Sequence, residues 1–150
     1  EVVSWDQPMI RSAQEGLMGF IVKKINGIFH FLVQAKLESG NFDIIEMAPT
    51  VQCLTGNYRK GKNEYTIPYL DQVLNAPKDK IWYSSYQSEE GGRFFQEQNL
   101  NVIVEVGNEF PVEVEENYCW MTLNQMLSFV TYNNYLNIAA RSLLSAISLY

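Results

Sequence analysis

The sequence predicts a single α+β domain in which antiparallel strands come first and helices come last. An Asn26-Gly27 pair separates two runs of alternating apolar residues, which is the strongest short-range signal of a β-hairpin. Residues Thr122 to Gln125 have the pattern of a capping box, which marks the start of a helix. Between these segments, residues 81–88, IWYSSYQS, read as a strand.

The length of the Asn26-Gly27 loop sets the register of the predicted hairpin, because a two-residue loop places the flanking residues opposite each other. The expected pairs are Ile25 with Ile28, Val22 with Phe31, Phe20 with Val33, and Gly19 with Gln34.

Successive side chains of a strand point to opposite faces, so this register also separates two faces. The first is apolar enough to be core and carries Met18, Phe20, Val22, Phe29, Phe31, Val33 and Ala35. The second carries Gly19, His30, Leu32, Gln34 and Lys36. A glycine weakens a strand, so Gly19 indicates the close approach of a ligand or of another backbone. An ordinary half-polar outer face is the alternative for Gln34 and Lys36.

The remaining elements follow in chain order. Residues 1–16 read as an irregular arm, and residues 55–64 as a polar loop. We expect strands at 42–47, 81–88 and 101–106, a short helix over 69–75 behind Pro68, and a helical turn over 93–98. The strand, helix, strand order permits a parallel pair in a mixed sheet. Two helices end the chain, and the second, from about Asn137, places Ala140, Leu143, Leu144 and Ile147 on one face.

Composition narrows the classes of function. A chain of 150 residues that is 47% hydrophobic builds a sizeable core, and a net charge of −6 argues against a nucleic-acid partner. No apolar run approaches the roughly 20 residues of a membrane span, so we expect no membrane association. Cys53 and Cys119 are far apart without a nearby histidine, which favours buried, reduced thiols over zinc ligands and indicates the cytoplasm.

The segment Gln87 to Phe95 is a second candidate for chemistry, weaker by itself than the Gly19, Gln34 and Lys36 face of the hairpin. Glycines between a strand and a helical turn would present backbone N–H groups to an anion, and Arg93 would add a bidentate donor. An ordinary turn explains Gly91-Gly92 equally well. Glu89 and Glu90 could act as acid or base, or could simply begin a solvated helix. The sequence has no Ser-His-Asp order, phosphate-binding Walker loop, dinucleotide fingerprint or metal-ligand cluster.

The sequence resembles the NDP-hexose 2,3-dehydratase family, whose members make deoxysugars. The matching segments keep the family order along nearly the whole chain: Trp5-Asp6-Gln7-Pro8, 19–41, 48–52, Asn57-Tyr58, 87–94, 101–106, 120–123 and 137–145. The resemblance implies a Nudix-like mixed β-sheet flanked by helices, without the metal-binding glutamate box of Nudix hydrolases. It also implies a dTDP-4-keto-6-deoxyhexose substrate that loses water across carbons 2 and 3, with no redox cofactor and no metal.

The resemblance carries candidate site residues over by position. The substrate-binding candidates are Trp5, Gln7, Gln34, Lys36, Asn41, Thr50, Gln52, Gln87, Ser88 and Arg93. The catalytic candidates are Glu89 and Tyr58, and the base is not assigned between them. Lys36 and Arg93 offer cationic donors, so we expect them at the diphosphate or the sugar oxygens. The hypothesis is a cavity floored by Gln34 and Lys36 and roofed by Arg93.

The resemblance also leaves alternatives open. Full family enzymes are similar to two fused copies of such a domain, whereas this chain supplies one. It is therefore a catalytic domain, or a non-catalytic nucleotide-sugar-binding module that works as a homodimer or beside a second homologous copy. A Nudix-type hydrolase is disfavoured, because the glutamate box is not found and that chemistry would demand a divalent metal.

Overall fold

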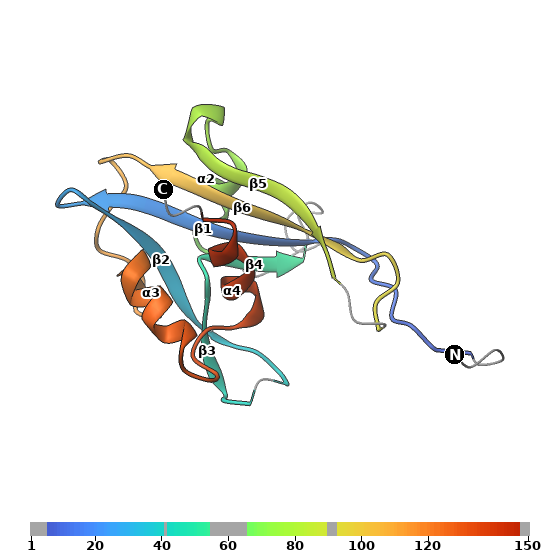
Figure 1. Ribbon diagram of the computed structural model, residues 1–150. Helices are drawn as coiled ribbons and strands as arrows, with labels where there is room; N and C mark the ends of the chain where they lie inside the picture. Colours follow the sequence, from blue (N-terminus) through green and yellow to red (C-terminus); the bar gives the residue numbers. More distant parts are fainter. Residues whose placement is uncertain (1–5, 41, 55–65, 90–92, 148–150) are drawn as a thin grey trace.

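The computed structural model describes residues 6–40, 42–54, 66–89 and 93–147, and its centre is one mixed sheet (Figure 1). The strands are β1 (Gly16–Ile25), β2 (Ile28–Leu37), β3 (Ile45–Pro49), β4 (Val51–Leu54), β5 (Ile81–Ser88), β6 (Gln98–Val106) and β7 (Tyr118–Thr122). The helices are α2 (Leu70–Leu74), α3 (Leu123–Val130) and α4 (Ile138–Ser145), with a 3-10 turn η1 (Lys78–Lys80). The main path of the sheet is β3-β2-β1-β6-β5, while β4 pairs with β1 and β7 with β2.

The Asn26-Gly27 hairpin between β1 and β2 is confirmed. Both loop residues have positive φ, 50° for Asn26 and 85° for Gly27, as a tight hairpin turn requires. The register beside the turn is the predicted one, with Ile25 opposite Ile28 and Val22 opposite Phe31.

The hairpin does not continue as predicted beyond Val22, because β3 and β4 enter between its two strands. β4 pairs with β1, which places Gly19 opposite Val51, and β3 pairs with β2, which places Val33 opposite Pro49. The predicted pairs of Gly19 with Gln34 and of Phe20 with Val33 are therefore wrong. Each splayed strand forms its ladder with the inserted segment instead.

Thr50 occupies the point where the strands divide and is 1% exposed. Its hydroxyl oxygen accepts a hydrogen bond from the backbone N–H of Ile21 at 2.9 Å, and the hydroxyl donates to the backbone carbonyl of Leu32. One side chain thus satisfies a buried donor of β1 and a buried acceptor of β2, which the split removes from direct pairing.

The sheet is mixed, as predicted, although the parallel pair lies elsewhere. β6 runs parallel to β1 from Gly16 opposite Asn99 onward, and it runs antiparallel to β5. The predicted helical turn over 93–98 is not found in the described residues. Instead, Ile10 N–H donates to Arg93 C=O at 2.6 Å and Phe95 N–H donates to Ile10 C=O at 2.8 Å. The N-terminal arm thereby takes the backbone groups that a helical turn would pair internally.

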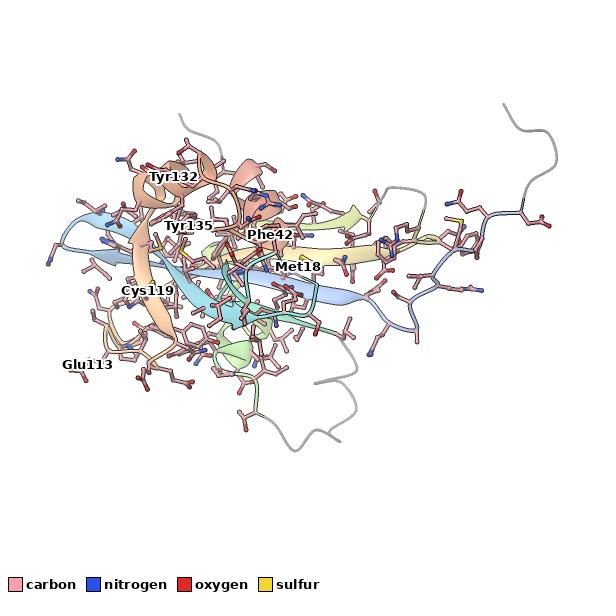
Figure 2. All side chains as sticks on the ribbon, turned by 90° about the horizontal axis from the view of Figure 1, so that it is seen from below. Met18, Phe42, Glu113, Cys119, Tyr132 and Tyr135 are labelled. Atoms are coloured by element: carbon pink, nitrogen blue, oxygen red, sulfur yellow. The ribbon has the colours of Figure 1, made fainter. Side chains whose placement is uncertain are left out.

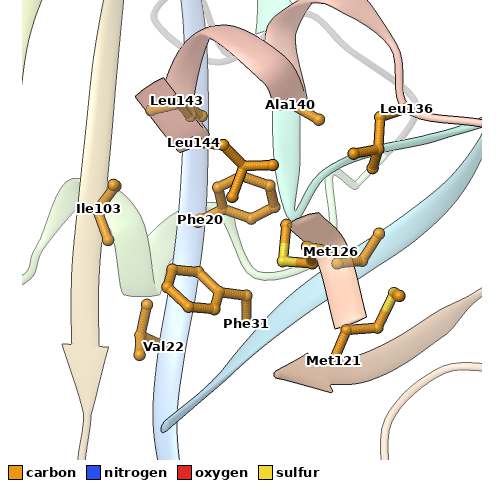
Figure 3. Packing of buried hydrophobic residues seen from close by; sticks show 11 residues of the cluster. Phe20, Val22, Phe31, Ile103, Met121, Met126, Leu136, Ala140, Leu143 and Leu144 are labelled. Carbon is orange, nitrogen blue, oxygen red and sulfur yellow. The ribbon is translucent and has the colours of Figure 1, made fainter. Parts of the chain in front are cut away.

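α3 and α4 cover one face of the sheet, as the C-terminal pattern predicts. Thr122 and Gln125 form the predicted capping box with both reciprocal bonds, and Asn137 caps α4 by accepting from Ala140 N–H at 2.9 Å. Figure 3 shows the helices packed over Phe20 and Phe31. The two rings meet edge to face, with their centroids 5.7 Å apart. This first core comprises Phe20, Val22, Phe31, Val33, Ile103, Met121, Met126, Leu136, Ala140, Leu143 and Leu144.

The opposite face is also a core, which corrects its interpretation as a half-polar outer face. Leu17, Ile21 and Leu32 are buried there under α2 and the segment before β7. A Cβ on Gly19 would lie 3.0 Å from Val73 Cγ1 of α2, so the group that approaches Gly19 most closely is a side chain, and not the ligand or backbone that we expected.

β7 was not predicted, and it completes this second core. Tyr118 of β7 is 8% exposed, and its hydroxyl lies 3.4 Å from the carbonyl of Thr50. Burial raises the pKa of Tyr118 to about 12, with further contributions from Glu115 and Tyr69.

Both cysteines are free thiols. Cys53 is half-buried, and burial raises the pKa of its thiol to about 11. Cys119 is exposed on β7, so the prediction of burial is wrong for it, although partial burial still raises the pKa of its thiol. None of the described helices is both long and apolar enough to cross a bilayer.

We predict that Thr50→Val lowers the free energy of unfolding by about 3 kcal/mol, because an isosteric methyl leaves two buried backbone groups unsatisfied. Thr50→Ser, which keeps the hydroxyl, is the matched control and should lose clearly less. Urea unfolding followed by circular dichroism measures both. Equal losses in the two variants would contradict the bridging role.

We further predict that Tyr118 makes stability fall with rising pH between about 10 and 12. The unfolded tyrosine loses its proton near pH 10, whereas the folded one keeps it to about pH 12, so its stabilisation is complete below pH 10 and lost above. Tyr118→Phe should show a shallower fall in urea unfolding across this range. Identical slopes would exclude Tyr118 as the source.

Candidate functional site

A polar cavity of about 170 Å³ lies where β5, β6 and β1 meet the start of α4. It is lined by Met18, Gln87, Ser88, Glu89, Asn99, Asn101, Ile138, Ala139 and Ser142. Whole small-molecule sites typically measure roughly 300–1,000 Å³, so this cavity suits one part of a larger ligand.

Strand periodicity explains why polar groups gather here. Asn99 and Asn101 lie on the same face of β6 as Ile103, which belongs to the first core. On β5, Gln87 lies on the same face as Tyr83, which packs against the first core. The Gln87 side chain donates a hydrogen bond to the Tyr83 hydroxyl at 2.9 Å. The face that is apolar beneath α3 and the middle of α4 therefore becomes polar at the first turn of α4.

Asn99 connects the cavity to the main sheet. It is 7% exposed, and its Oδ1 accepts from Gly16 N–H at 2.8 Å, while its Nδ2 donates to Glu89 Oε2 at 2.9 Å. The Glu89 backbone N–H donates to Glu97 C=O at 2.9 Å. The Glu89 carboxylate is thus held at the cavity by its side chain and its backbone.

The first turn of α4 is positioned by a separate polar cluster. Asn137 Nδ2 donates to Gln52 Oε1 at 2.7 Å, and Gln52 Nε2 donates to Glu38 Oε1 at 3.0 Å. Gln52, predicted to bind substrate, therefore supports the helix that walls the cavity, through the Asn137 cap.

Three of the residues predicted from the sequence meet in this cavity, namely Gln87, Ser88 and Glu89. They adjoin one another in the sequence, but β5 and its ladder with β6 decide that they share a cavity with Asn99 and Asn101.

The sequence predicts that Gln34 and Lys36 form the floor of the binding cavity, and the structure does not place them in this cavity. Gln34 follows Leu32 on the face of the second core, and its Nε2 donates to the carbonyls of Pro49 at 2.7 Å and Thr50 at 3.3 Å. Lys36 lies opposite Glu46 in the ladder with β3, on that same face of β2. Neither lines the cavity, which opens on the other face, because the inserted segment occupies this side of the hairpin.

The other predicted residues have different positions. Thr50 is the buried bridge between β1 and β2, and Arg93 is exposed, with its backbone joined to Ile10 of the arm. Arg93 is not among the residues that line the cavity, so the predicted roof is not formed there. Gln7 is exposed in the arm. Trp5, Asn41 and Tyr58 lie outside the described residues.

Sequence reasoning missed Asn99 and Asn101, which are the buried polar residues of the cavity. The predicted strand began at Asn101, but β6 begins three residues earlier, at Gln98. The alternation Asn99, Asn101, Ile103 was the signal that could have placed both amides on one buried face.

A larger and more open hollow of about 680 Å³ lies between the β2–β3 connection and the α3–α4 connection. Glu38 and Glu46 line it, and the Arg141 guanidinium is engaged by the carbonyl of Leu136. Phe42 and Tyr132 at its border are 87% and 62% exposed (Figure 2). Two carboxylates make it a poor site for a diphosphate.

The described residues contain no group of three or more His, Cys, Asp or Glu side chains placed to hold a metal ion. Among the residues that the structure describes, the groups whose pKa is clearly shifted are Tyr118, Cys53 and Cys119, and none of them lines the cavity.

The fold is that of a Nudix-like α+β domain. The chain superposes on an ADP compounds hydrolase with a TM-score of 0.54 at 12% identity, covering 92% of this chain and 72% of that one. It also superposes on the C-terminal domain of mouse MUTYH, solved in complex with human PCNA, with a TM-score of 0.56 at 8% identity, covering 89% and 86%.

The family follows from sequence comparison. Residues 1–147 match the family model described as NDP-hexose 2,3-dehydratase, and the chain belongs to this family. It is 41% identical over 147 residues to a dTDP-4-dehydro-6-deoxy-alpha-D-glucopyranose 2,3-dehydratase of Streptomyces violaceoruber, covering 98% of this chain and 32% of that protein. The protein of the same name in Saccharopolyspora spinosa is 42% identical, with 98% and 30% covered. The chain thus spans about a third of these relatives.

We predict that Asn99→Asp destabilises the protein by about 1–3 kcal/mol at neutral pH, because it replaces the amide donor opposite Glu89 with a second carboxylate. Adding Glu89→Gln restores a donor and should recover much of the loss, as a double-mutant cycle in urea would measure. Strictly additive effects would mean that the two side chains are not coupled.

Proposed function

We propose that this chain is a nucleotide-sugar dehydratase domain that eliminates water across carbons 2 and 3 of a dTDP-4-keto-6-deoxyhexose in deoxysugar biosynthesis. The observation that carries the proposal is the family match along residues 1–147, with relatives 41% and 42% identical that are named for this activity. We also propose that the protein is a cytoplasmic lyase that needs no redox cofactor.

Glu89 is the proposed base. Asn99 orients its carboxylate at the cavity, where it can meet part of a ligand. The 4-ketone acidifies the proton on carbon 3, so a carboxylate can remove that proton as general base. The electron pair of the broken C–H bond forms the carbon 2–carbon 3 double bond, and the carbon 2–oxygen bond breaks. The departing hydroxide takes a proton from an acid and leaves as water, and the resulting enol rearranges to a ketone.

Nucleotide binding is proposed for residues outside the small cavity, because a dTDP-sugar is larger than 170 Å³ allows. Arg93 is exposed and lies four positions beyond Glu89, so it is our candidate for the diphosphate. Gln87 and Ser88 are candidates for the sugar. Trp5, Gln7 and Asn41 remain binding candidates, and Tyr58 a catalytic candidate, from the resemblance alone.

A second candidate is a non-catalytic nucleotide-sugar-binding module that works as a homodimer or beside a second homologous domain. One observation favours it: the chain spans only about a third of its relatives. In that case the domain would bind the ligand and leave catalysis to another part of the assembly.

We predict that dTDP raises the melting temperature of the protein in EDTA, because the proposed binding needs no divalent metal. The protein should then convert dTDP-4-keto-6-deoxyglucose to a product lighter by one water, detected by mass spectrometry. Glu89→Gln should abolish turnover and keep dTDP binding.

The controls separate the readings. A flat dTDP titration would overturn any nucleotide-sugar role. Binding without elimination by the unaltered chain would favour the module. Full turnover by Glu89→Gln would remove Glu89 as the base.

A further inference from the structure

The cavity contains a buried amide whose hydrogen-bonding capacity is incompletely used. Asn101 is 2% exposed, and its Nδ2 donates to the backbone carbonyl of Asn99 at 3.0 Å. Its Oδ1 is buried and has no hydrogen-bond partner among the residues that the structure describes. It is the sole side-chain atom of that kind in this part of the chain.

The neighbouring backbone fixes which end of the amide is unpartnered. Turning the Asn101 amide over would bring its oxygen against the carbonyl oxygen of Asn99, which cannot donate. The free group is therefore an acceptor, and the ligand group that satisfies it must be a donor.

A buried acceptor without a partner costs about 1–3 kcal/mol, so native proteins rarely keep one without a use. A leucine at this position would have a similar size and would carry no such cost. The most direct use is a ligand that supplies the missing donor, because Asn101 borders the same cavity as Glu89.

We propose that Asn101 is a specificity residue of this cavity, whose side-chain oxygen accepts a hydrogen bond from a ring hydroxyl of the bound sugar. The inference rests on the proposed function and deepens it, since it assigns the cavity to the hexose. A hydroxyl is the donor that a hexose offers, and a cavity of about 170 Å³ suits a sugar ring better than a whole nucleotide.

Two features of the surroundings support this assignment. Asn101 bonds to the backbone of Asn99, and the side chain of Asn99 bonds to the carboxylate of Glu89, the candidate base. A sugar bound to Asn101 would therefore lie beside that carboxylate. Oδ1 is also shielded from bulk water, so a hydrogen bond from the ligand would replace no bond to solvent. A buried polar group satisfied only by a hydroxyl-bearing ligand discriminates strongly against ligands that lack the hydroxyl.

The test compares dTDP-glucose with dTDP, using the whole 150-residue chain and isothermal titration calorimetry. Asn101→Leu should weaken dTDP-glucose binding roughly tenfold or more and leave dTDP binding unchanged. Its melting temperature without ligand should equal or exceed that of the unaltered protein, because the unpartnered oxygen is gone. Asn124→Leu on the exposed side of α3 is the matched control and should change neither affinity.

The outcomes are distinct. If Asn101→Leu binds dTDP-glucose as the unaltered protein does, the role of Asn101 is overturned while the proposed function stands. If the unaltered protein binds neither ligand, the proposed function fails and the inference fails with it. If Asn101→Leu does not fold, the side-chain amide resonances of Asn101 in the unaltered protein decide. Their movement with dTDP-glucose but not with dTDP supports the role, and no movement with either overturns it.

Discussion

The hydroxyl of Thr50 is the interaction on which the arrangement of this domain depends. A hairpin whose strands separate leaves backbone groups of both strands without partners, and burial makes each such group costly. The Thr50 hydroxyl bonds to one backbone group on each strand. The side chains of Gln34 and Tyr118 donate hydrogen bonds to the backbone carbonyl of Thr50. The split is thereby stable, and it lets both faces of the sheet be buried, one under α3 and α4 and the other under α2 and the segment before β7.

The candidate site follows from this arrangement. Because β4 pairs with β1, Gln52 lies close enough to bond to Asn137, the residue that caps α4. The first turn of α4 then lies beside the first residues of β6. In Figure 1, α4 lies over the sheet. The polar residues of β5 and β6 line one cavity together with the first turn of α4. The cavity is therefore formed by packing of the sheet against one helix, and the hairpin that dominates the sequence pattern contributes Met18 of β1 to its lining.

Much of the fold could be predicted from the sequence because its signals are local. The Asn26-Gly27 turn, the capping box at Thr122 and the strand over 81–88 each depend on neighbouring residues. The insertion of β3 and β4, the bridge from the arm to Phe94 and the strand β7 depend on partners far along the chain, and no local pattern indicates them. The site divides in the same way. Gln87 to Glu89 were found as a motif. Gln34 and Lys36 were assigned to a pocket because the strand predicted after the hairpin was not expected to enter between β1 and β2. The shared face of Asn99 and Asn101 became clear only from the pairing of β6 with its neighbours.

The parallel pairing of β1 with β6 has a consequence for how the chain folds. Its first contact joins Gly16 to Asn99, so the central ladder of the sheet closes only after a long intervening loop has been ordered. Such nonlocal contacts incur loop entropy before they return any stabilisation, which slows folding. During synthesis, the apolar strand β1 must wait until β6 has left the ribosome, so the newly made chain would benefit from chaperone protection of that exposed edge.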